Sequence, residues 1–169
     1  MEFSQRHYFR IPALAALIFV LGTLVPARAD IEAGKAAIHA KDYTAAFKEL
    51  RPEAGKGNAD ALYMLATMHA AGWGTPKNLD RAHALFGQAA ELGHVPAQKE
   101  YGVALILSEG VEQNVNEGLK WLLLASQAAH KGAQVYYSQL SKSFPRPVIS
   151  AARRAAFEWR TEQKKKQEK

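Results

Sequence analysis

The feature that most constrains the fold is an internal repeat with a period of 36 residues. When the chain is shifted by one period, small residues superpose on small residues and large apolar residues superpose on large apolar residues. The clearest matches are Gly57 with Gly93, Gly74 with Gly110, Ala61 with Ala97 and Ala133, and Leu50 with Phe86 and Leu122. A regular period of this length is typical of a solenoid, in which each unit packs on its neighbours.

Each period contains two helices. Ala61, Leu65 and Met68 are spaced so that they share one face of a helix. Asn78 is suited to begin a second helix as an N-cap. The connection 72–76 holds two glycines and a proline, which do not continue a helix. Each unit is therefore predicted to be a helical hairpin.

The hairpins define the predicted domain layout, a solenoid over residues 30–143. Because the second copy carries about three additional residues, its second helix is expected to be nearly a turn longer. Prolines at 145 and 147 interrupt the helical pattern, and a capping helix that covers the open end of the array is expected from Pro147. The predicted segments are a half repeat at 31–57, repeats at 59–93 and 95–132, a final helix at 133–143, a capping helix at 147–160 and a basic disordered tail at 161–169.

The repeats resemble a known family. The pattern is carried by Ala61, Leu65, Ala66, Gly72, Gly74, Asn78, Ala82, Leu85, Ala89, Ala90 and Gly93. It is similar to the Sel-one-like repeat, a tetratricopeptide-like unit of about 36 residues. The sequence departs from the family where His69 replaces a tyrosine, Ser108 replaces a loop glycine and Gly118 replaces an alanine. The resemblance implies an all-α, right-handed solenoid that works as an adaptor or scaffold by binding another protein.

The N-terminus has the pattern of a secretory signal peptide. Arg6 and Arg10 precede an apolar run over 11–25, and Ala27-Arg28-Ala29 supplies the small residues that signal peptidase requires. Cleavage before Asp30 would remove residues 1–29 and place the protein in the periplasm or outside a bacterial cell. An uncleaved membrane anchor is the alternative.

The positive charge is concentrated at the C-terminus. The stretch 142–169 holds nine basic and three acidic residues, whereas 30–141 holds ten basic and twelve acidic residues. The repeats therefore have no basic groove, and nucleic acid is not an expected partner. Most charge runs are solvated, and we favour this interpretation for the tail. Binding of the tail to a membrane surface remains a further alternative.

The sequence contains no pattern typical of a catalytic, cofactor or metal site. There is no cysteine, no Gly-x-Ser-x-Gly motif and no Ser-x-x-Lys motif, and the histidines are not spaced as metal ligands on a helix. His69 is predicted to be a hydrogen-bonded core residue. We expect a non-enzymatic protein without a cofactor. A cell-wall or penicillin-interacting hydrolase is the alternative from another functional class.

The predicted partner-binding surface lies on the first helices of successive hairpins. Related positions in three such helices form one continuous concave face if the hairpins stack. Val103 and Ile106 are apolar there, so either they contact a partner or terminal helices cover them, and Lys120 is expected on the outer face. Trp73 in the loop is a further candidate, because tryptophan is a common anchor residue at interfaces. The alternative is that this side chain folds back on its own hairpin. The candidate residues are Tyr63, Thr67, Trp73, Lys99, Val103, Ile106, Val135 and Gln139.

Overall fold

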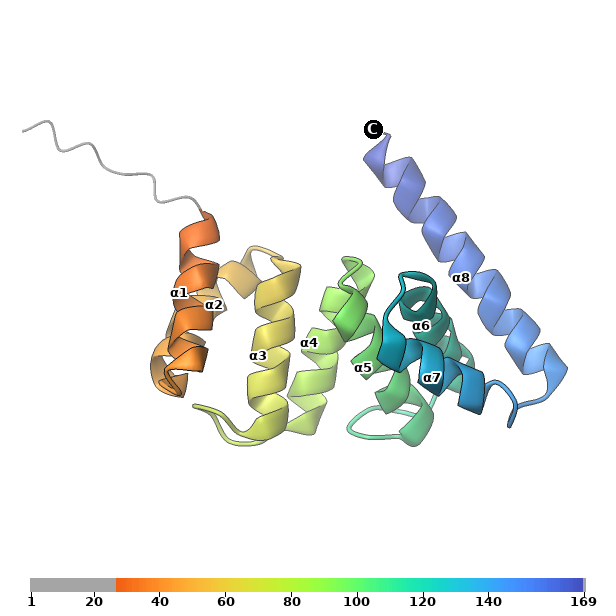
Figure 1. The fold of residues 1–169 in the computed structure, drawn as a ribbon, viewed down its shortest axis with the longest axis horizontal. Helices are drawn as coiled ribbons and strands as arrows, with labels where there is room; N and C mark the ends of the chain where they lie inside the picture. The colour runs from red at the N-terminus through yellow and green to blue at the C-terminus, as the bar shows by residue number, and fades with distance from the viewer. Residues whose placement is uncertain (1–26, 169) are drawn as a thin grey trace, which may run out of the picture.

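The computed structural model describes residues 27–168, which form a row of helices (Figure 1). No strand occurs within this range. The helices are α1 (Ala27–His39), α2 (Tyr43–Gly55), α3 (Ala59–Ala71), α4 (Leu79–Glu91), α5 (Val95–Leu107), α6 (Val115–Gln127), α7 (Lys131–Leu140) and α8 (Arg146–Gln167). The all-α fold expected from the repeat is confirmed.

The first six helices form three hairpins, α1–α2, α3–α4 and α5–α6, and the second helix of each hairpin also packs on the first helix of the next unit. This pattern of neighbour contacts is that of a solenoid. The prediction of a half repeat at 31–57 is wrong, because α1 and α2 form a complete hairpin with a short connection at 40–42. The final helix α7 is shorter than expected and has one buried residue, Ala133.

The 36-residue period is visible in the helix caps. Asp42, Asn78 and Asn114 cap the second helices, and each side-chain oxygen accepts a hydrogen bond from the backbone N–H three residues later. Asn58 caps α3. The structurally equivalent residues His94 and His130 cap α5 and α7 through Nδ1, each at 3.2 Å from a backbone nitrogen. Because these bonds satisfy N–H groups that a helix leaves unpaired, they fix where each helix begins.

The two inner hairpins close through the same turn. In both, the residue after the first helix is left-handed, with φ of 76° at Gly72 and 58° at Ser108. The backbone N–H groups of Asn78 and Asn114 donate hydrogen bonds to carbonyl oxygens of the preceding helix, each at 2.9 Å. The prediction of a longer second helix in the second copy is wrong, since α4 and α6 each span 13 residues.

Two glycines allow α5 and α6 to touch through their backbones. A Cβ on Gly102 would lie 2.8 Å from the carbonyl oxygen of Gly118, and a Cβ on Gly118 would lie 2.7 Å from the carbonyl oxygen of Gly102. A Cβ on Gly118 would also lie 2.6 Å from Cγ1 of Ile106. The alanine usual at position 118 would therefore collide with its neighbours.

The last helix packs on α6 rather than forming a hairpin with α7 (Figure 1). Ala152 and Ala156 are buried, and the indole N–H of Trp159 donates to Glu91 at the end of α4 at 3.0 Å. The Trp159 ring meets the fully buried Trp121 edge-on, with centroids 5.5 Å apart. The predicted disordered tail at 161–169 is wrong for most of its length, because α8 continues to Gln167.

Residues 1–26 of the expected signal peptide lie outside the described residues, and α1 begins at Ala27. Within residues 27–168, none of the helices combines the length and the apolar character needed to cross a membrane.

Candidate partner-binding site

An apolar pocket lies between α1 and α3, on the side of the array lined by the first helices. Its volume is about 240 Å³. Ile38 from α1 and Met64 and Met68 from α3 provide apolar surface, and Lys35 and His39 bring basic groups to it. We call this the α1–α3 pocket; it is lined by Lys35, Ile38, His39, Tyr63, Met64, Thr67, Met68 and Trp73. The pocket thus unites three of the predicted site residues, one of them from the loop.

Trp73 is held at this pocket by the preceding hairpin. Its ring stacks on Tyr43, with centroids 4.9 Å apart and planes 12° apart. The loop reaches Tyr43 because Gly74 has φ of 66° and no side chain; a Cβ there would lie 2.4 Å from the Tyr43 carbonyl oxygen. The residue is 37% exposed. Trp73 therefore folds back on α2 instead of on its own hairpin, and keeps a free face at the pocket.

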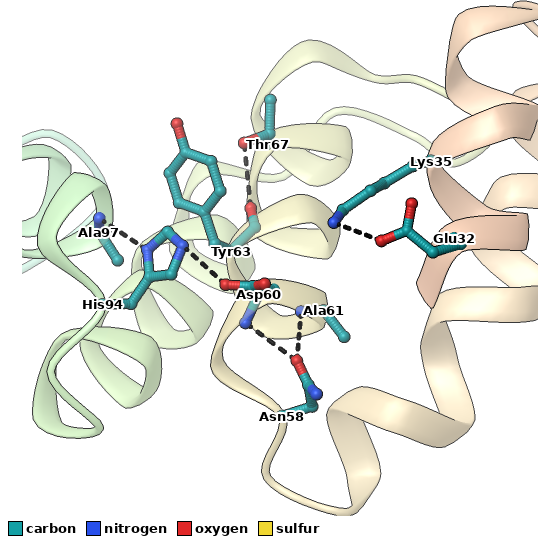
Figure 2. A network of polar contacts seen from close by, with 9 residues as sticks. All are labelled: Glu32, Lys35, Asn58, Asp60, Ala61, Tyr63, Thr67, His94 and Ala97. Carbon is teal, nitrogen blue, oxygen red and sulfur yellow. Dashed lines mark hydrogen bonds and ion pairs between the residues drawn. The ribbon is translucent and has the colours of Figure 1, made fainter. Parts of the chain in front are cut away.

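Tyr63 and Thr67 lie one turn apart on α3 (Figure 2). The Thr67 hydroxyl donates to the Tyr63 carbonyl oxygen at 3.0 Å, which leaves its methyl group for the pocket. The Tyr63 ring packs against Phe86 and His94, with centroid distances of 5.6 and 4.6 Å. Burial is the main cause that raises the pKa of Tyr63, with Glu100 acting in the same direction. The phenol is therefore neutral at physiological pH.

His94 connects the two inner hairpins (Figure 2). Its Nδ1 accepts from the Ala97 N–H, so the proton of the neutral ring lies on Nε2, which is 3.3 Å from Oδ1 of Asp60 on α3. Burial lowers the pKa of His94, and the nearby Asp60 carboxylate opposes that shift. The neutral form favours the cap, because a proton on Nδ1 would remove the acceptor and add positive charge at a helix N-terminus.

The other predicted contact residues lie outside the α1–α3 pocket. Lys99 is at the position equivalent to Tyr63; its ammonium group bonds Glu100 at 2.7 Å and lies 5.5 Å from the centre of the Tyr136 ring. Val103 is half-buried beside the second core cluster. On α7, Val135 and Gln139 are exposed. These residues belong to the α5 and α7 part of the array, beyond the pocket.

Ile106 does not belong to an accessible face, and its assignment to the partner-binding surface is wrong. It is 5% exposed and packs in a core cluster with Leu119 and Leu122. Its side chain fills the space that Gly118 leaves open. Lys120 is not a solvent-exposed outer residue either, because it is 7% exposed, pairs with Glu117 and lies 3.9 Å from the centre of the Trp121 ring.

The sequence pattern does not predict five of the eight residues that line the pocket. Three of these, Lys35, Ile38 and His39, lie on α1, and a half repeat at 31–57 predicts no groove wall there. The signal was available in the cap residue Asp42, which lies one period before Asn78. A complete first hairpin follows from that match.

The histidines do not form a metal site in the described part of the chain, where no group of three or more His, Cys, Asp or Glu side chains is placed to hold an ion. His69 packs edge-on against Phe47, with centroids 5.5 Å apart. Its buried Nδ1 has no hydrogen-bond partner among these residues. The prediction of a hydrogen-bonded core histidine is therefore not supported at Nδ1.

Comparison with known proteins identifies the repeats. A family model described as the Sel1 repeat matches residues 59–94 and 95–130. The chain contains two Sel1 repeats. The matched ranges begin at the first residues of α3 and α5 and end at the histidine caps of the following helices.

Two relatives and two solved structures show how far the similarity extends. An F-box protein of Arabidopsis thaliana is 39% identical over 100 residues, covering 54% of this chain and 26% of the relative. Chitin synthase regulatory factor 2 of Schizosaccharomyces pombe is 35% identical over 78 residues, covering 46% of this chain and 15% of the relative. The matched part of the chain thus spans about a quarter or less of these proteins.

The structural neighbours support the fold. A protective antigen from uropathogenic Escherichia coli, with an SLR fold, superposes with a TM-score of 0.74 at 21% identity, over 80% of this chain and 30% of that one. A Sel1 repeat protein from Oxalobacter formigenes gives a TM-score of 0.63 at 24% identity, over 76% of this chain and 55% of that one. Sel1 repeats typically act as protein-interaction scaffolds and are generally non-catalytic.

Proposed function

We propose that this protein is an exported adaptor that binds another protein by accepting an apolar side chain of its partner in the α1–α3 pocket. The observation that carries the proposal is the pocket itself, in which methionine, isoleucine and aromatic side chains meet solvent at the boundary of two hairpins. Sel1 repeats typically serve in protein interactions, and that general role is the background for the assignment.

The composition of the pocket favours a peptide segment as the ligand. The half-buried Met64 is a flexible side chain that adapts to different apolar side chains, and the fully buried Met68 forms the apolar base beneath it. Trp73 presents an aromatic face that is already fixed by stacking on Tyr43, so little conformational entropy is lost on binding. A helix or an extended segment of a partner would place one anchor side chain in the pocket and run along α3 and α5.

In-cell photocrosslinking tests the proposal. A photoreactive amino acid at position 35, on the rim of the pocket, is expected to capture a partner, and the same residue at exposed position 139 is expected to capture much less of it. Mass spectrometry of the crosslinked peptide then identifies the bound segment. Equal capture at both positions would contradict a site at the pocket.

Matched charge variants provide the quantitative test. Thr67→Glu places a carboxylate in the apolar pocket, and Gln139→Glu adds the same charge two periods later. Loss of a good anchor contact costs about 2 kcal/mol or more, so Thr67→Glu should weaken the partner captured by crosslinking at least about 30-fold. Gln139→Glu should bind as the parent does. Both variants must first melt like the parent protein.

Export is a separate part of the proposal and has its own test. The apolar run and the Ala27-Arg28-Ala29 sequence support cleavage before Asp30. N-terminal sequencing of protein from the periplasm is expected to begin at Asp30. Intact protein that stays in the membrane after carbonate washing would instead support the anchor.

A further inference from the structure

The exposed side of α8 carries a stripe of basic residues with one aromatic ring at its centre. Successive members of the stripe are separated by three, four or seven residues, so they follow one side of the helix. Each is exposed, and Phe157 is 64% exposed although it is a large apolar side chain. We call this the α8 stripe; its members are Arg146, Arg153, Phe157, Arg160 and Lys164.

Apart from one hydrogen bond of Arg153 to Tyr137, the stripe lies outside the side of the helix that packs on the solenoid. The buried residues of α8 are Ala152 and Ala156, and Trp159 bonds to Glu91, so α6 and the end of α4 pack on a different side of the helix from the stripe. The row from Arg146 to Lys164 is about 27 Å long at 1.5 Å per residue. In Figure 1, the C-terminal part of α8 rises away from the rest of the array.

The positive charge of the stripe is not neutralised within the described structure. None of its basic side chains forms an ion pair with a carboxylate of residues 31–168. Arg153 makes one hydrogen bond, from Nε to the Tyr137 hydroxyl at 3.4 Å. The carboxylates of α8 are Glu158 and Glu162, which lie outside the stripe register, and Glu168, which follows the helix. The helix therefore presents a net positive surface to its surroundings.

We propose that the α8 stripe binds the surface of a bilayer rich in anionic phospholipids. The guanidinium and ammonium groups would contact headgroup phosphates, and Phe157 would enter the interface between headgroups and acyl chains. The interface would bury the exposed Phe157 ring while the neighbouring cations stay among the headgroups. A straight, convex row of long side chains matches an extended surface, whereas an acidic protein would need a complementary groove about 27 Å long.

The orientation leaves the α1–α3 pocket accessible. α8 lies at the far end of the array from α1 (Figure 1), and each member of the stripe is exposed. A molecule bound through α8 would therefore keep the pocket, which is lined by α1, α3 and Trp73, away from the bound helix. The proposal does not depend on the function assigned to the pocket.

A site-specific probe separates contact through α8 from any contact through the apolar N-terminal segment. The chain has no cysteine, so Ser150→Cys on the exposed side of α8 and Thr44→Cys on α2 each give one labelling position. The full chain is purified without any change to the N-terminus that the expressing cell produces, and it is labelled with a polarity-sensitive fluorophore. Vesicles with 30% phosphatidylglycerol should shift the emission of the label at 150 to the blue, whereas pure phosphatidylcholine vesicles, or a label at 44, should give no shift.

Charge variants then test which residues carry the affinity. Each basic residue near an anionic surface contributes about fivefold to binding, so Arg153→Gln, Arg160→Gln and Lys164→Gln together should weaken binding to the anionic vesicles about 100-fold. The control Lys48→Gln, Arg51→Gln and Lys77→Gln removes the same net charge from exposed positions of the solenoid and should bind as the parent does. Phe157→Ala should weaken binding about tenfold.

Three results would overturn the proposal. The first is a label at 150 that responds equally to neutral and anionic vesicles, which would assign the contact to the N-terminal segment. The second is an equal loss of vesicle binding in the stripe variant and in the control variant, which would show that binding depends on the net charge of the protein and not on the stripe. The third is a stripe that binds soluble polyglutamate but not the vesicles, which would identify an acidic polymer as the ligand.

Discussion

The two Sel1 repeats have the same geometry but differ in the residues that produce it. In the first repeat, α3–α4, the left-handed loop position is Gly72 and the left-handed position after the second helix is Gly93. In the second repeat, α5–α6, the same positions are Ser108 and Ala129, with φ of 58° and 62°. A left-handed backbone is readily adopted by glycine and unfavourable for other residues. The second repeat therefore holds strained loops that the first does not.

The contact between the two helices of a repeat also differs, and here the second repeat has the glycines. Ala66 and Ala82 are fully buried where α3 meets α4. Their equivalents Gly102 and Gly118 allow α5 and α6 to approach until each backbone would collide with a Cβ on the other helix. Ile106 then fills the remaining space. The shape of a repeat therefore depends on a set of matched residues. In the second repeat, the close contact between α5 and α6 offsets the strain in the loops.

The largest predicted effect comes from closing the space between α5 and α6. Gly102→Ala should destabilise the protein by about 2 kcal/mol, because its Cβ meets a backbone oxygen that has no alternative position. Chemical denaturation of the full chain measures the change. The matched control is Gly55→Ala in α2, where nothing lies within 4 Å of the added carbon and a helix gains a better helix former. If Gly102→Ala were as harmless as Gly55→Ala, the close contact would not constrain the second repeat.

The period of the sequence was sufficient to predict the fold. The helices, the loop positions and the caps repeat every 36 residues, and local rules for caps and glycines place their boundaries to within a few residues. The error at 31–57 arose because α1 lacks the loop signature that the later units share. The error at the C-terminus arose because a polar sequence was expected to fray, whereas α8 is anchored on α6 by Ala152, Ala156 and Trp159 and continues beyond them.

The candidate site was less predictable because it depends on which neighbour covers each side chain. Thr67 and Ile106 both lie on first helices, yet Thr67 lines a pocket and Ile106 is buried against Gly118. The difference comes from a missing Cβ on another helix, which periodicity does not reveal. Lys120 is a similar case, since its burial depends on Trp121 and Glu117.

The strain at the loops of the second repeat predicts a smaller effect of opposite sign. Ser108→Gly should stabilise the protein by about 1 kcal/mol, because glycine adopts the observed φ without a steric cost. The reciprocal change Gly72→Ser should destabilise it by a similar amount. Both are measured by denaturation at the same pH. Equal stabilities of parent and Ser108→Gly would mean that the serine is not strained and that the two loops are equivalent in energy as well as in shape.

The smallest predicted effect concerns the boundary between the two repeats. There His94 is the N-cap of α5, at the position where Asn58 is the N-cap of α3. Burial lowers the pKa of His94 below the value of about 6.5 expected for an unfolded chain, so the unfolded state takes up the proton first as the pH falls. The contribution of His94 to stability is therefore complete above about pH 6.5 and declines as the pH falls toward the lower folded pKa. The groups that face the ring are Asp60, which opposes the shift, and the neutral Tyr63.

Two substitutions separate the titration from the cap. His94→Asn keeps an acceptor for the Ala97 N–H, and so should match the parent near pH 7.5 but lose less stability than the parent as the pH falls from 7.5 to 5.5. His94→Gln provides a poor cap and should be less stable near pH 7.5, with the same weak dependence on pH as His94→Asn. Urea denaturation at a series of pH values measures all three proteins. A parent and a His94→Asn variant with parallel pH profiles would show that His94 does not titrate on unfolding, and the joint between the repeats would then be insensitive to acid.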